Sequence, residues 1–393
     1  MTAPAWRRRL GAWADELRAL RHDLHRYPET AFEEVRTAAT VARLLRRWGV
    51  ETHEGIAGTG VVGVIRGGDG PMIGLRADMD ALNMEEANAF AHRSEVPGKM
   101  HGCGHDGHTV MLLAAARLLA ERPHFGGTAI LIFQPAEEAE GGAQAMIDAG
   151  LFDRWPVDAV FALHNLPGLP IGHFALRPGP IMAGVEDFTI RIEGKGGHGG
   201  IPHRTIDPIP AIAEIVLACQ TIVARAIDPL AAAVVSVTRL SAGASNNVVP
   251  DSAQIGGTFR YLDGATGDVI RSRLTALTRG VAAAHGVTGH FDCFDAYPPT
   301  VNSDAETAFC AATLRTFVGA ERLDESTPPL MGAEDFSFML NRRPGCYAFI
   351  GNGDGAGSCM IHNPRYDFND ASIPIGAEYF VRLVHAFCAR SGR

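Results

Sequence analysis

Eight consecutive residues constrain this chain more than any others, because positions 101–108 read His-Gly-Cys-Gly-His-Asp-Gly-His. Histidine and cysteine are good metal ligands, and the alternating glycines lack the Cβ atoms that would keep the backbone from wrapping round a centre. The apolar run at 110–120 reads as a helix whose N-terminal end would lower the pKa of Cys103 and favour the thiolate. The octapeptide therefore predicts a metal-binding loop before a buried helix, although each residue alone could be an ordinary turn or core residue.

Composition limits the partners and the compartment. At 393 residues the chain is long enough for two or three domains. Its net charge of −9 gives no electrostatic footprint for nucleic acid or an anionic membrane surface, so we expect small molecules as partners. The basic start is not followed by a signal-peptide pattern, and we see no run of about 18 apolar residues. Seven irregularly spaced cysteines suit reduced thiols, and together these features predict a cytoplasmic protein without membrane contact.

Short apolar runs that end in polar residues indicate a buried sheet. They lie at 61–65, 72–76, 129–133 and 157–163. Asp78 and Asp80 follow the second run, Glu137 and Glu138 follow the third, and His164 follows the fourth. Open α/β sheets carry their chemistry at the carboxyl ends of their strands. The alternation of these strands with helical segments predicts a mixed or largely parallel sheet with helices on both faces.

The pattern changes after about residue 182. Strand, helix, strand, strand, helix and strand now follow at 185–192, 208–227, 232–240, 253–261, 266–285 and 290–294. This order is typical of the ferredoxin-like sandwich. We therefore predict a mixed-sheet α/β catalytic domain of residues 1–181 and 297–393, with an inserted ferredoxin-like α+β satellite domain at 182–296.

The ends of strands and loops in the predicted catalytic domain supply one candidate set: Cys103 with His105, Glu137 and Glu138, His164, and His362. A hydrolytic pair of divalent ions about 3.5–4 Å apart needs a bridging anion, terminal ligands and an open position for water. The Cys103 thiolate would bridge. Adjacent residues leaving a strand point in different directions, so of Glu137 and Glu138 one can bind metal while the other faces the bound water. Glu137 would then take a proton from the water and return it to the leaving amine.

Three aspartates suit a supporting role around these ligands. Asp78, Asp80 and Asp106 can accept ring N–H groups from ligating histidines and fix their tautomers. Taken singly, Glu137 and Glu138 could merely complement the next helix, and His164 and His362 could be ordinary strand-end and loop residues. Only the combination favours the metal interpretation.

Motifs spread over the chain together point to one family. They are Arg21-His-Asp-Leu-His25-Arg-Tyr-Pro28-Glu29, Leu75-Arg-Ala-Asp78-Met-Asp80-Ala-Leu82, the octapeptide at 101–108, Gln134-Pro-Ala-Glu137-Glu138, His164-Asn165, Gly194-Lys-Gly-Gly-His198, Asn246-Asn-Val-Val-Pro-Asp251, Glu334-Asp335-Phe336 and His362-Asn363-Pro364. With them the chain resembles the amidohydrolase branch of the aminoacylase and carboxypeptidase G-type metallopeptidases, which includes hippurate hydrolases and plant auxin-conjugate hydrolases. The wider superfamily has His-x-Asp at Asp78-Met79-Asp80 and bridges its metals with aspartate instead of Cys103, so both departures indicate this branch rather than the dipeptidases.

The resemblance implies a role for each matching residue. By this resemblance, the family's ligands for two metal ions, in a phosphorylase/hydrolase-like catalytic domain, are matched by Cys103, His105, Glu138, His164 and His362. Glu137 matches its general base. The histidine matching His198 helps to polarise the scissile carbonyl, and the residues matching Asn246 and Arg260 lie near the free carboxylate of the substrate. Manganese is the metal most often found in this branch, with zinc, nickel or cobalt also seen, while a thiolate bridge by its softness favours zinc. In dimeric members the histidine matching His198 reaches the partner's metal site, so we expect a homodimer with sites completed in trans.

We therefore expect a metal-dependent amidohydrolase that cleaves an N-acyl or N-aroyl amino acid into a carboxylate and a free amino acid. One alternative is a small-peptide hydrolase that uses the same site. Another is a metal-independent hydrolase in which Cys103 is the nucleophile and a histidine its base. A third, a catalytically silent metal-binding module, would leave a base carboxylate beside a ligand carboxylate without purpose.

Overall fold

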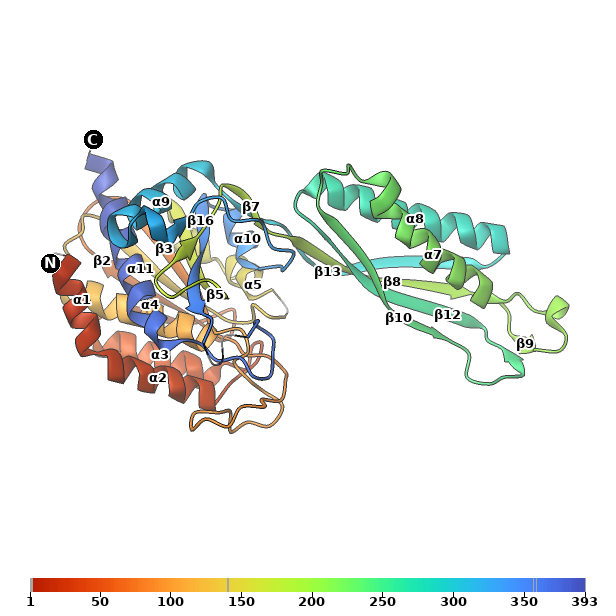
Figure 1. Ribbon diagram of the computed structural model, residues 1–393, viewed down its shortest axis with the longest axis horizontal. Coiled ribbons are helices and arrows are strands. Elements are labelled where there is room, and N and C mark those ends of the chain that lie inside the picture. The colour runs from red at the N-terminus through yellow and green to blue at the C-terminus, as the bar shows by residue number, and fades with distance from the viewer. Residues whose placement is uncertain (1–2, 140, 356, 358, 393) are drawn as a thin grey trace. The chain divides into compact units, whose positions relative to one another are not determined.

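The chain folds as two compact units, which are seen in a computed structural model that describes residues 3–139, 141–355, 357 and 359–392 (Figure 1). The first unit comprises Met1–Gly179, Val301–Pro328 and Asp335–Arg393. The second comprises Pro180–Thr300 together with Pro329–Glu334. Each unit has an apolar core of its own, and the second is inserted between parts of the first.

A large mixed sheet organises the first unit. In chain order its strands are β1 (Glu51–Ile56), β2 (Gly60–Arg66), β3 (Met72–Asp78), β4 (Thr128–Gln134), β5 (Ala159–Pro167), β6 (Phe174–Ala175), β15 (Leu323–Asp324) and β16 (Gly345–Gly353). They are arranged as β1-β2-β4-β3-β5-β16-β6-β15. β4, β3, β5 and β16 are parallel to one another, whereas β1, β2 and β6 each run antiparallel to a neighbour. The mixed α/β fold predicted from the sequence is confirmed.

Helices cover this sheet. They are α1 (Ala3–Ala12), α2 (Ala14–Arg26), α3 (Val35–Arg47), α4 (His105–Glu121), α5 (Gly142–Asp148), α6 (Leu151–Arg154), α9 (Asp304–Val318), α10 (Phe336–Leu340) and α11 (Ile373–Cys388). α4 and α11 pack against each other and against β3 (Figure 1). Alternate residues of β3, Ile73, Leu75 and Ala77, enter that core. Arg76 points to the opposite face of the sheet because side chains alternate along a strand.

Two segments of the candidate site have different secondary structure from that predicted. α4 begins at His105 rather than near residue 110, so that only residues 101–104 form a loop. Gly104, with φ of 94°, ends this loop in the left-handed region, which glycine adopts without a steric penalty. β5 continues to Pro167 because β16 pairs with it along that stretch. His164 therefore lies within the strand instead of after it.

The second unit is the predicted ferredoxin-like sandwich. Its elements are β8 (Gly184–Glu193), β9 (Gly197–His198), α7 (Pro208–Ala226), β10 (Ala233–Ala242), β11 (Val248–Val249), β12 (Ser252–Tyr261), α8 (Gly264–His285) and β13 (Thr288–Tyr297). The four long strands form an antiparallel sheet in the order β10-β12-β8-β13, and β9 pairs with β11. β7 (Gly179–Met182) and β14 (Thr300–Asn302) form a separate two-stranded sheet.

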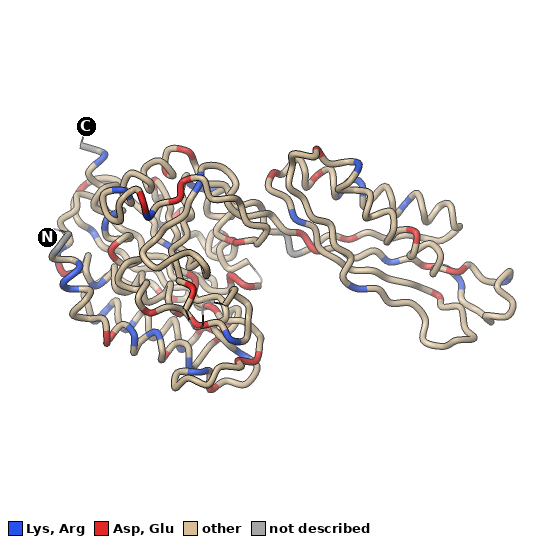
Figure 2. The backbone as a smooth tube through the Cα atoms, viewed as in Figure 1, with Lys and Arg blue, Asp and Glu red and all other residues tan. Residues whose placement is uncertain are grey.

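The two helices of the second unit begin and end where their sequences signal. The side chains of Asp207 and Asp263 accept backbone N–H groups at the starts of α7 and α8, and α8 ends at Gly286 in the left-handed region. α7 is long and apolar enough to cross a membrane by length and composition alone. Its residues Ala211, Ile215 and Cys219 are buried in the core of the second unit. Figure 2 shows Lys and Arg interspersed with Asp and Glu along the chain.

Candidate metal centre

Cys103 and His105 are placed by the tight entry into α4. A Cβ atom added to Gly104 would lie 2.4 Å from Nδ2 of Asn165 and 2.6 Å from the hydroxyl oxygen of Tyr366. The glycine therefore leaves room for two polar side chains directly behind the loop. Cys103 and His105 are buried, at 5% and 0% exposure.

Glu137 and Glu138 leave the end of β4 through a strained turn. Ala136 has φ of 54°, a left-handed conformation that is uncommon for a residue with a Cβ atom. It is held there because its N–H donates to Oε1 of Glu34 at 3.0 Å and its carbonyl accepts from the N–H of Gly142 at 3.0 Å. The turn directs the two glutamates out of the strand at the sheet edge where β3 and β5 also end.

The five predicted ligands converge in the first unit. One ligand atom each from Cys103, His105 and Glu138 lies within 4.8 Å of the others. Nε2 of His164 is 3.4 Å from Sγ of Cys103, and Nε2 of His362 is 3.3 Å from Oε2 of Glu138. Two ligands of one tetrahedral ion, each about 2.0–2.3 Å from it, lie roughly 3.3–3.8 Å apart. The spacing of these donors is therefore that of groups able to share cations.

The tautomers of two histidines leave lone pairs facing the cluster. Nδ1 of His105 lies 3.2 Å from Oδ1 of Asp80, and Nδ1 of His164 lies 2.7 Å from the backbone oxygen of Asn165. An oxygen acceptor at Nδ1 places the proton there and leaves Nε2 free to ligate. Nε2 of His105 and Oε1 of Glu138 are buried and, among the described residues, have no hydrogen-bond partner. Two buried orphaned acceptors 3.8 Å apart fit a bound cation.

The electrostatics of the cluster also fit a cation. Burial would lower the pKa of His105, but the carboxylates of Asp78, Asp80 and Glu138 raise it to about 10. Without a bound positive charge, the surplus of carboxylates draws a proton onto a ligand nitrogen. A divalent ion would replace that proton.

The thiol of Cys103 behaves differently from the sequence-based expectation. Burial, followed by the charges of Glu138 and Glu137, raises the pKa of Cys103 well above its usual value. The start of α4 does not outweigh these effects. Burial also holds the pKa of His164 well below its ordinary value. Since thiolate is the nucleophilic form of cysteine, this environment disfavours the metal-independent cysteine hydrolase.

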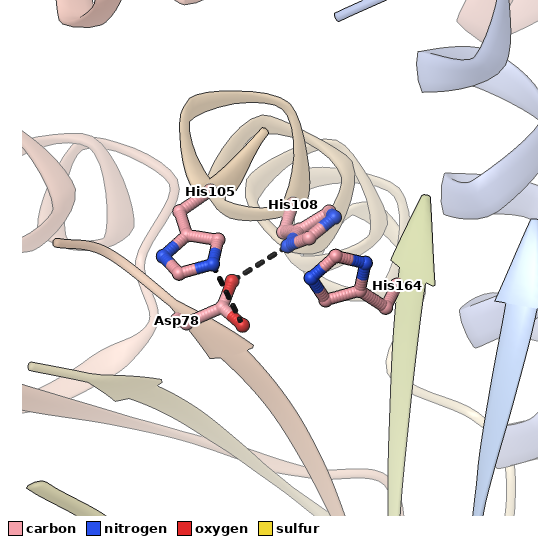
Figure 3. Close-up of side chains that lie close together, drawn as sticks. All are labelled: Asp78, His105, His108 and His164. Carbon is pink, nitrogen blue, oxygen red and sulfur yellow. Dashed lines mark hydrogen bonds and ion pairs between the residues drawn. The ribbon is translucent and has the colours of Figure 1, made fainter. Parts of the chain in front are cut away.

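His108 occupies a place that the sequence analysis left unassigned. Asp78, His105, His108 and His164 lie together, with His105 and His108 on the first turn of α4 and His164 on β5 (Figure 3). Nδ1 of His108 is 2.6 Å from Oδ1 of Asp78, and its Nε2 accepts the backbone N–H of Asn165 at 3.0 Å. Both ring nitrogens are thus engaged by protein groups, and His108 supports the centre rather than offering a ligand atom.

The three supporting aspartates have different partners. Asp80 contacts the candidate ligand His105, as predicted. Asp78 contacts His108 and accepts from Nη1 of Arg76 at 2.7 Å, while its Oδ2 lies 3.7 Å from Nε2 of His105. In the described part of the chain, Asp106 contacts His25, at 2.8 Å, and Arg21 rather than a candidate ligand. The side chain of Asp106 faces α2, because it lies on another side of the first turn of α4.

A buried hydrogen-bond network that the sequence analysis missed holds Glu137. Oε1 of Glu137 accepts the backbone N–H of Asp335 at 3.3 Å. The Asp335 carboxylate receives Nη2 of Arg76 at 3.0 Å and Nε2 of Gln134 at 2.8 Å. Arg76 is only 2% exposed, and its charge is neutralised by ion pairs with Asp78 on one side and Asp335 on the other. The signal for this network was Arg76, which lies within β3 after a run of apolar residues and glycine.

The remaining predicted residues lie in the second unit. His198 on β9 is exposed and opposite Val248, and Asn246 lies in the exposed turn just before β11. Arg260 lies near the end of β12, opposite Val185, where its Nη1 donates to the backbone oxygen of Met331 at 3.0 Å. His198 and Asn246 thus share one end of this unit, whereas Arg260 lies at the other end of its sheet.

The site defines a class of protein. Cysteine, histidine and glutamate donors meet at the carboxyl end of a mixed sheet, with a second carboxylate beside them. This is the kind of centre on which metal-dependent hydrolases are built.

The chain belongs to Peptidase family M20/M25/M40, whose model matches residues 74–386. It is 40% identical over 370 residues to IAA-amino acid hydrolase ILR1-like 4 of Arabidopsis thaliana, covering 92% of this chain and 83% of that protein. It is 38% identical to hippurate hydrolase of Campylobacter jejuni, covering 94% and 95%. The YXEP protein of Bacillus subtilis, a dinuclear metal binding peptidase of the M20 family, matches it with a TM-score of 0.84 and 32% identity over 97% of this chain and 99% of that one. The family resemblance seen in the sequence is confirmed.

Proposed function

We propose that this protein is a metal-dependent amidohydrolase that cleaves N-acyl or N-aroyl amino acids to a carboxylate and a free amino acid. The observation that carries the proposal is the convergence of Cys103, His105, Glu138, His164 and His362 around buried, unpartnered donor atoms. The relatives named hippurate hydrolase and IAA-amino acid hydrolase support an N-acyl amino acid as substrate.

Two divalent ions are the proposed cofactors, with those five residues as ligands. Support comes from the dinuclear centre of the Bacillus subtilis relative and from the donor set described above. Manganese and zinc are the leading candidates, with nickel and cobalt as further ones. A cysteine ligand favours zinc because thiolates are soft donors. When bound, the ions would supply positive charge that acidifies water and polarises the amide carbonyl.

Glu137 is the proposed general base. It is 7% exposed, and the backbone N–H of Asp335 donates to its Oε1 at 3.3 Å, which orients this carboxylate beside the proposed ligand Glu138. As the water oxygen bonds to the carbonyl carbon, Glu137 takes a proton from the water. When the carbon–nitrogen bond breaks, Glu137 returns the proton to the leaving amine. Asp80 holds His105 and Glu138 in place during the reaction.

We further propose a homodimer in which His198 acts at the metal centre of the other subunit, with Asn246 and Arg260 near the free carboxylate of the substrate. Along β12, Ser252 pairs with Glu193 and Arg260 pairs with Val185. At about 3.3 Å per residue, the two ends of this strand are roughly 26 Å apart. A single substrate-sized site cannot take groups from both ends of one second unit, which supports completion in trans. The proposed compartment is the cytoplasm, consistent with seven free cysteines.

The test begins with metal removal. Chelated protein should lose its activity on N-acetyl, N-benzoyl and other N-acyl amino acids and regain it with zinc or manganese. Full activity after chelation combined with inactivation by a thiol alkylator would establish the cysteine mechanism instead. Turnover of small peptides without turnover of any N-acyl amino acid would favour the peptidase alternative.

A further inference from the structure

Asn165 makes an unusual number of contacts around the candidate metal centre. It follows His164 on β5 and is 1% exposed. Its Nδ2 donates to the backbone oxygen of Cys103 at 2.6 Å, and its backbone oxygen lies 2.7 Å from Nδ1 of His164. Its Oδ1 accepts the hydroxyl of Tyr366 at 2.6 Å. One residue therefore contacts the segments of two candidate ligands and the loop that carries a third, His362.

The orientation of the Asn165 amide follows from these partners. The carbonyl oxygen of Cys103 can only accept, so the NH₂ end must face it. The amide oxygen then faces Tyr366, whose hydroxyl must donate. The backbone N–H of Asn165 donates to Nε2 of His108 at 3.0 Å, which leaves the His108 proton on Nδ1 for Asp78. Every polar atom of Asn165 thus has a defined task.

The space behind the loop is shaped for this residue. Because Gly104 has no Cβ atom, the amide of Asn165 and the hydroxyl of Tyr366 fit directly against the turn that carries Cys103. Leaving the buried backbone carbonyl of Cys103 without a hydrogen-bond donor would cost free energy. The bond therefore favours one position of the Cys103 backbone, even when no ion is bound.

We propose that Asn165 is a positioning residue whose side chain presets the Cys103 loop and, through Tyr366, the loop of His362 for metal binding. This inference rests on the proposed metal-dependent function. It assigns the preorganisation of the centre to an uncharged side chain that donates no electron pair to the ion. Neighbours that orient ligands typically change metal affinity by roughly 10- to 100-fold when they are removed.

The experiment compares Asn165→Ala and Asn165→Asp with the wild type in the full-length protein. The aspartate is isosteric but places an oxygen against the Cys103 carbonyl, so it should disrupt the loop as strongly as alanine. We expect both variants to bind zinc roughly 10- to 100-fold more weakly in chelator competition. In the cobalt-substituted protein, the thiolate-to-cobalt absorption band should weaken or shift because the Cys103 sulfur is misplaced.

Asn302→Ala is the matched control. Asn302 is also buried, and its amide donates to the backbone oxygens of Arg177 and Tyr347 at 3.0 and 2.9 Å. Its removal should lower the unfolding temperature but leave zinc affinity and the cobalt band unchanged. Tyr366→Phe removes only the hydrogen bond from the Tyr366 hydroxyl to Asn165, so it should lower zinc affinity less than Asn165→Ala does. If Asn165→Ala does not fold, Tyr366→Phe provides the test instead.

The outcomes separate the two proposals. Wild-type protein without a thiolate-to-cobalt band would overturn the metal centre and this inference with it. A wild-type band together with unchanged zinc affinity and an unchanged band in the Asn165 variants, or in Tyr366→Phe where those do not fold, would overturn the positioning role alone.

Discussion

Nδ1 of His105 lies 3.2 Å from Oδ1 of Asp80, and the second oxygen of the same carboxylate accepts the backbone N–H of Glu138 at 2.9 Å. One side chain therefore orients two of the five proposed ligands, and it does so from the segment after β3. The isosteric change Asp80→Asn tests this relationship. An amide cannot accept from both groups, so its NH₂ end would force the His105 proton onto Nε2.

We expect Asp80→Asn to lower zinc affinity by roughly 10- to 100-fold, measured by chelator competition. Asp23→Asn is the control, because Asp23 pairs at the surface with Arg36 and contacts no proposed ligand in the described structure. Wild-type affinity in the Asp80 variant would show that this carboxylate does not set the tautomer of His105.

Substitutions of the adjacent residues Glu137 and Glu138 should have different effects on metal content and rate. Glu137→Gln removes a base but no proposed ligand, so it should retain both ions and lose roughly 10²–10⁴-fold in kcat. Glu138→Gln should lose metal occupancy as well as rate. Metal content by elemental analysis, beside kcat, distinguishes the two. Equal loss of metal in both variants would contradict the assignment of base and ligand.

The proposed dimer predicts complementation between defective subunits. His198→Ala and Glu137→Ala proteins should each be nearly inactive. After subunit exchange, a hybrid dimer carries one site with both defects and one with neither, so activity should return to about half that of a wild-type dimer per hybrid. Native mass spectrometry would verify that exchange has taken place. A mixture that exchanges yet stays inactive would show that His198 acts within its own subunit.

His25 should make stability depend on pH. Burial would lower its pKa, but hydrogen bonds to Asp106 and Glu86 raise it from 6.5 to about 9. The folded protein therefore holds a proton that the unfolded chain releases at lower pH. This contribution is fully present below pH 6.5 and is lost as the pH rises through about 9.

The magnitude is up to about 3 kcal/mol, since each pKa unit corresponds to about 1.4 kcal/mol. Urea unfolding of metal-free protein between pH 6 and about 9.5 would measure it. His25→Gln should flatten the decline with pH, and comparison with wild type cancels titration of the metal-centre groups. Parallel curves for the two proteins would assign the pH dependence to other residues.

Much of the fold could be read from the sequence because its strands and helices carry clear periodic patterns. The ferredoxin-like order of the second unit follows directly from alternation in β8 and from helical apolar faces in α7 and α8. β1 was missed because its sequence, Glu-Thr-His-Glu-Gly-Ile, has no apolar alternation. β6 and β15, each of two residues, are too short to leave any periodic signal.

In the site, the candidate ligands could be predicted because cysteine, histidine and glutamate are common metal-binding residue types. Among the residues that support the ligands, Asp80 was predicted, but several others were not. Asn165, Asp335 and Tyr366 act through hydrogen bonds to residues 62, 198 and 201 positions away in the chain, and such pairings depend on the folded backbone. The raised pKa of Cys103 was missed for the same reason, since burial and the neighbouring glutamates outweigh the start of α4.

The distance between the two ends of β12 has a consequence for how this enzyme would respond to dilution. Under the proposed arrangement, an isolated subunit retains all five ligands and its general base, but it lacks the His198 that a partner subunit supplies. Metal loading would then be independent of protein concentration, whereas turnover per subunit would fall once the concentration drops below the dissociation constant of the dimer. Catalysis would report on association, and metal content would not.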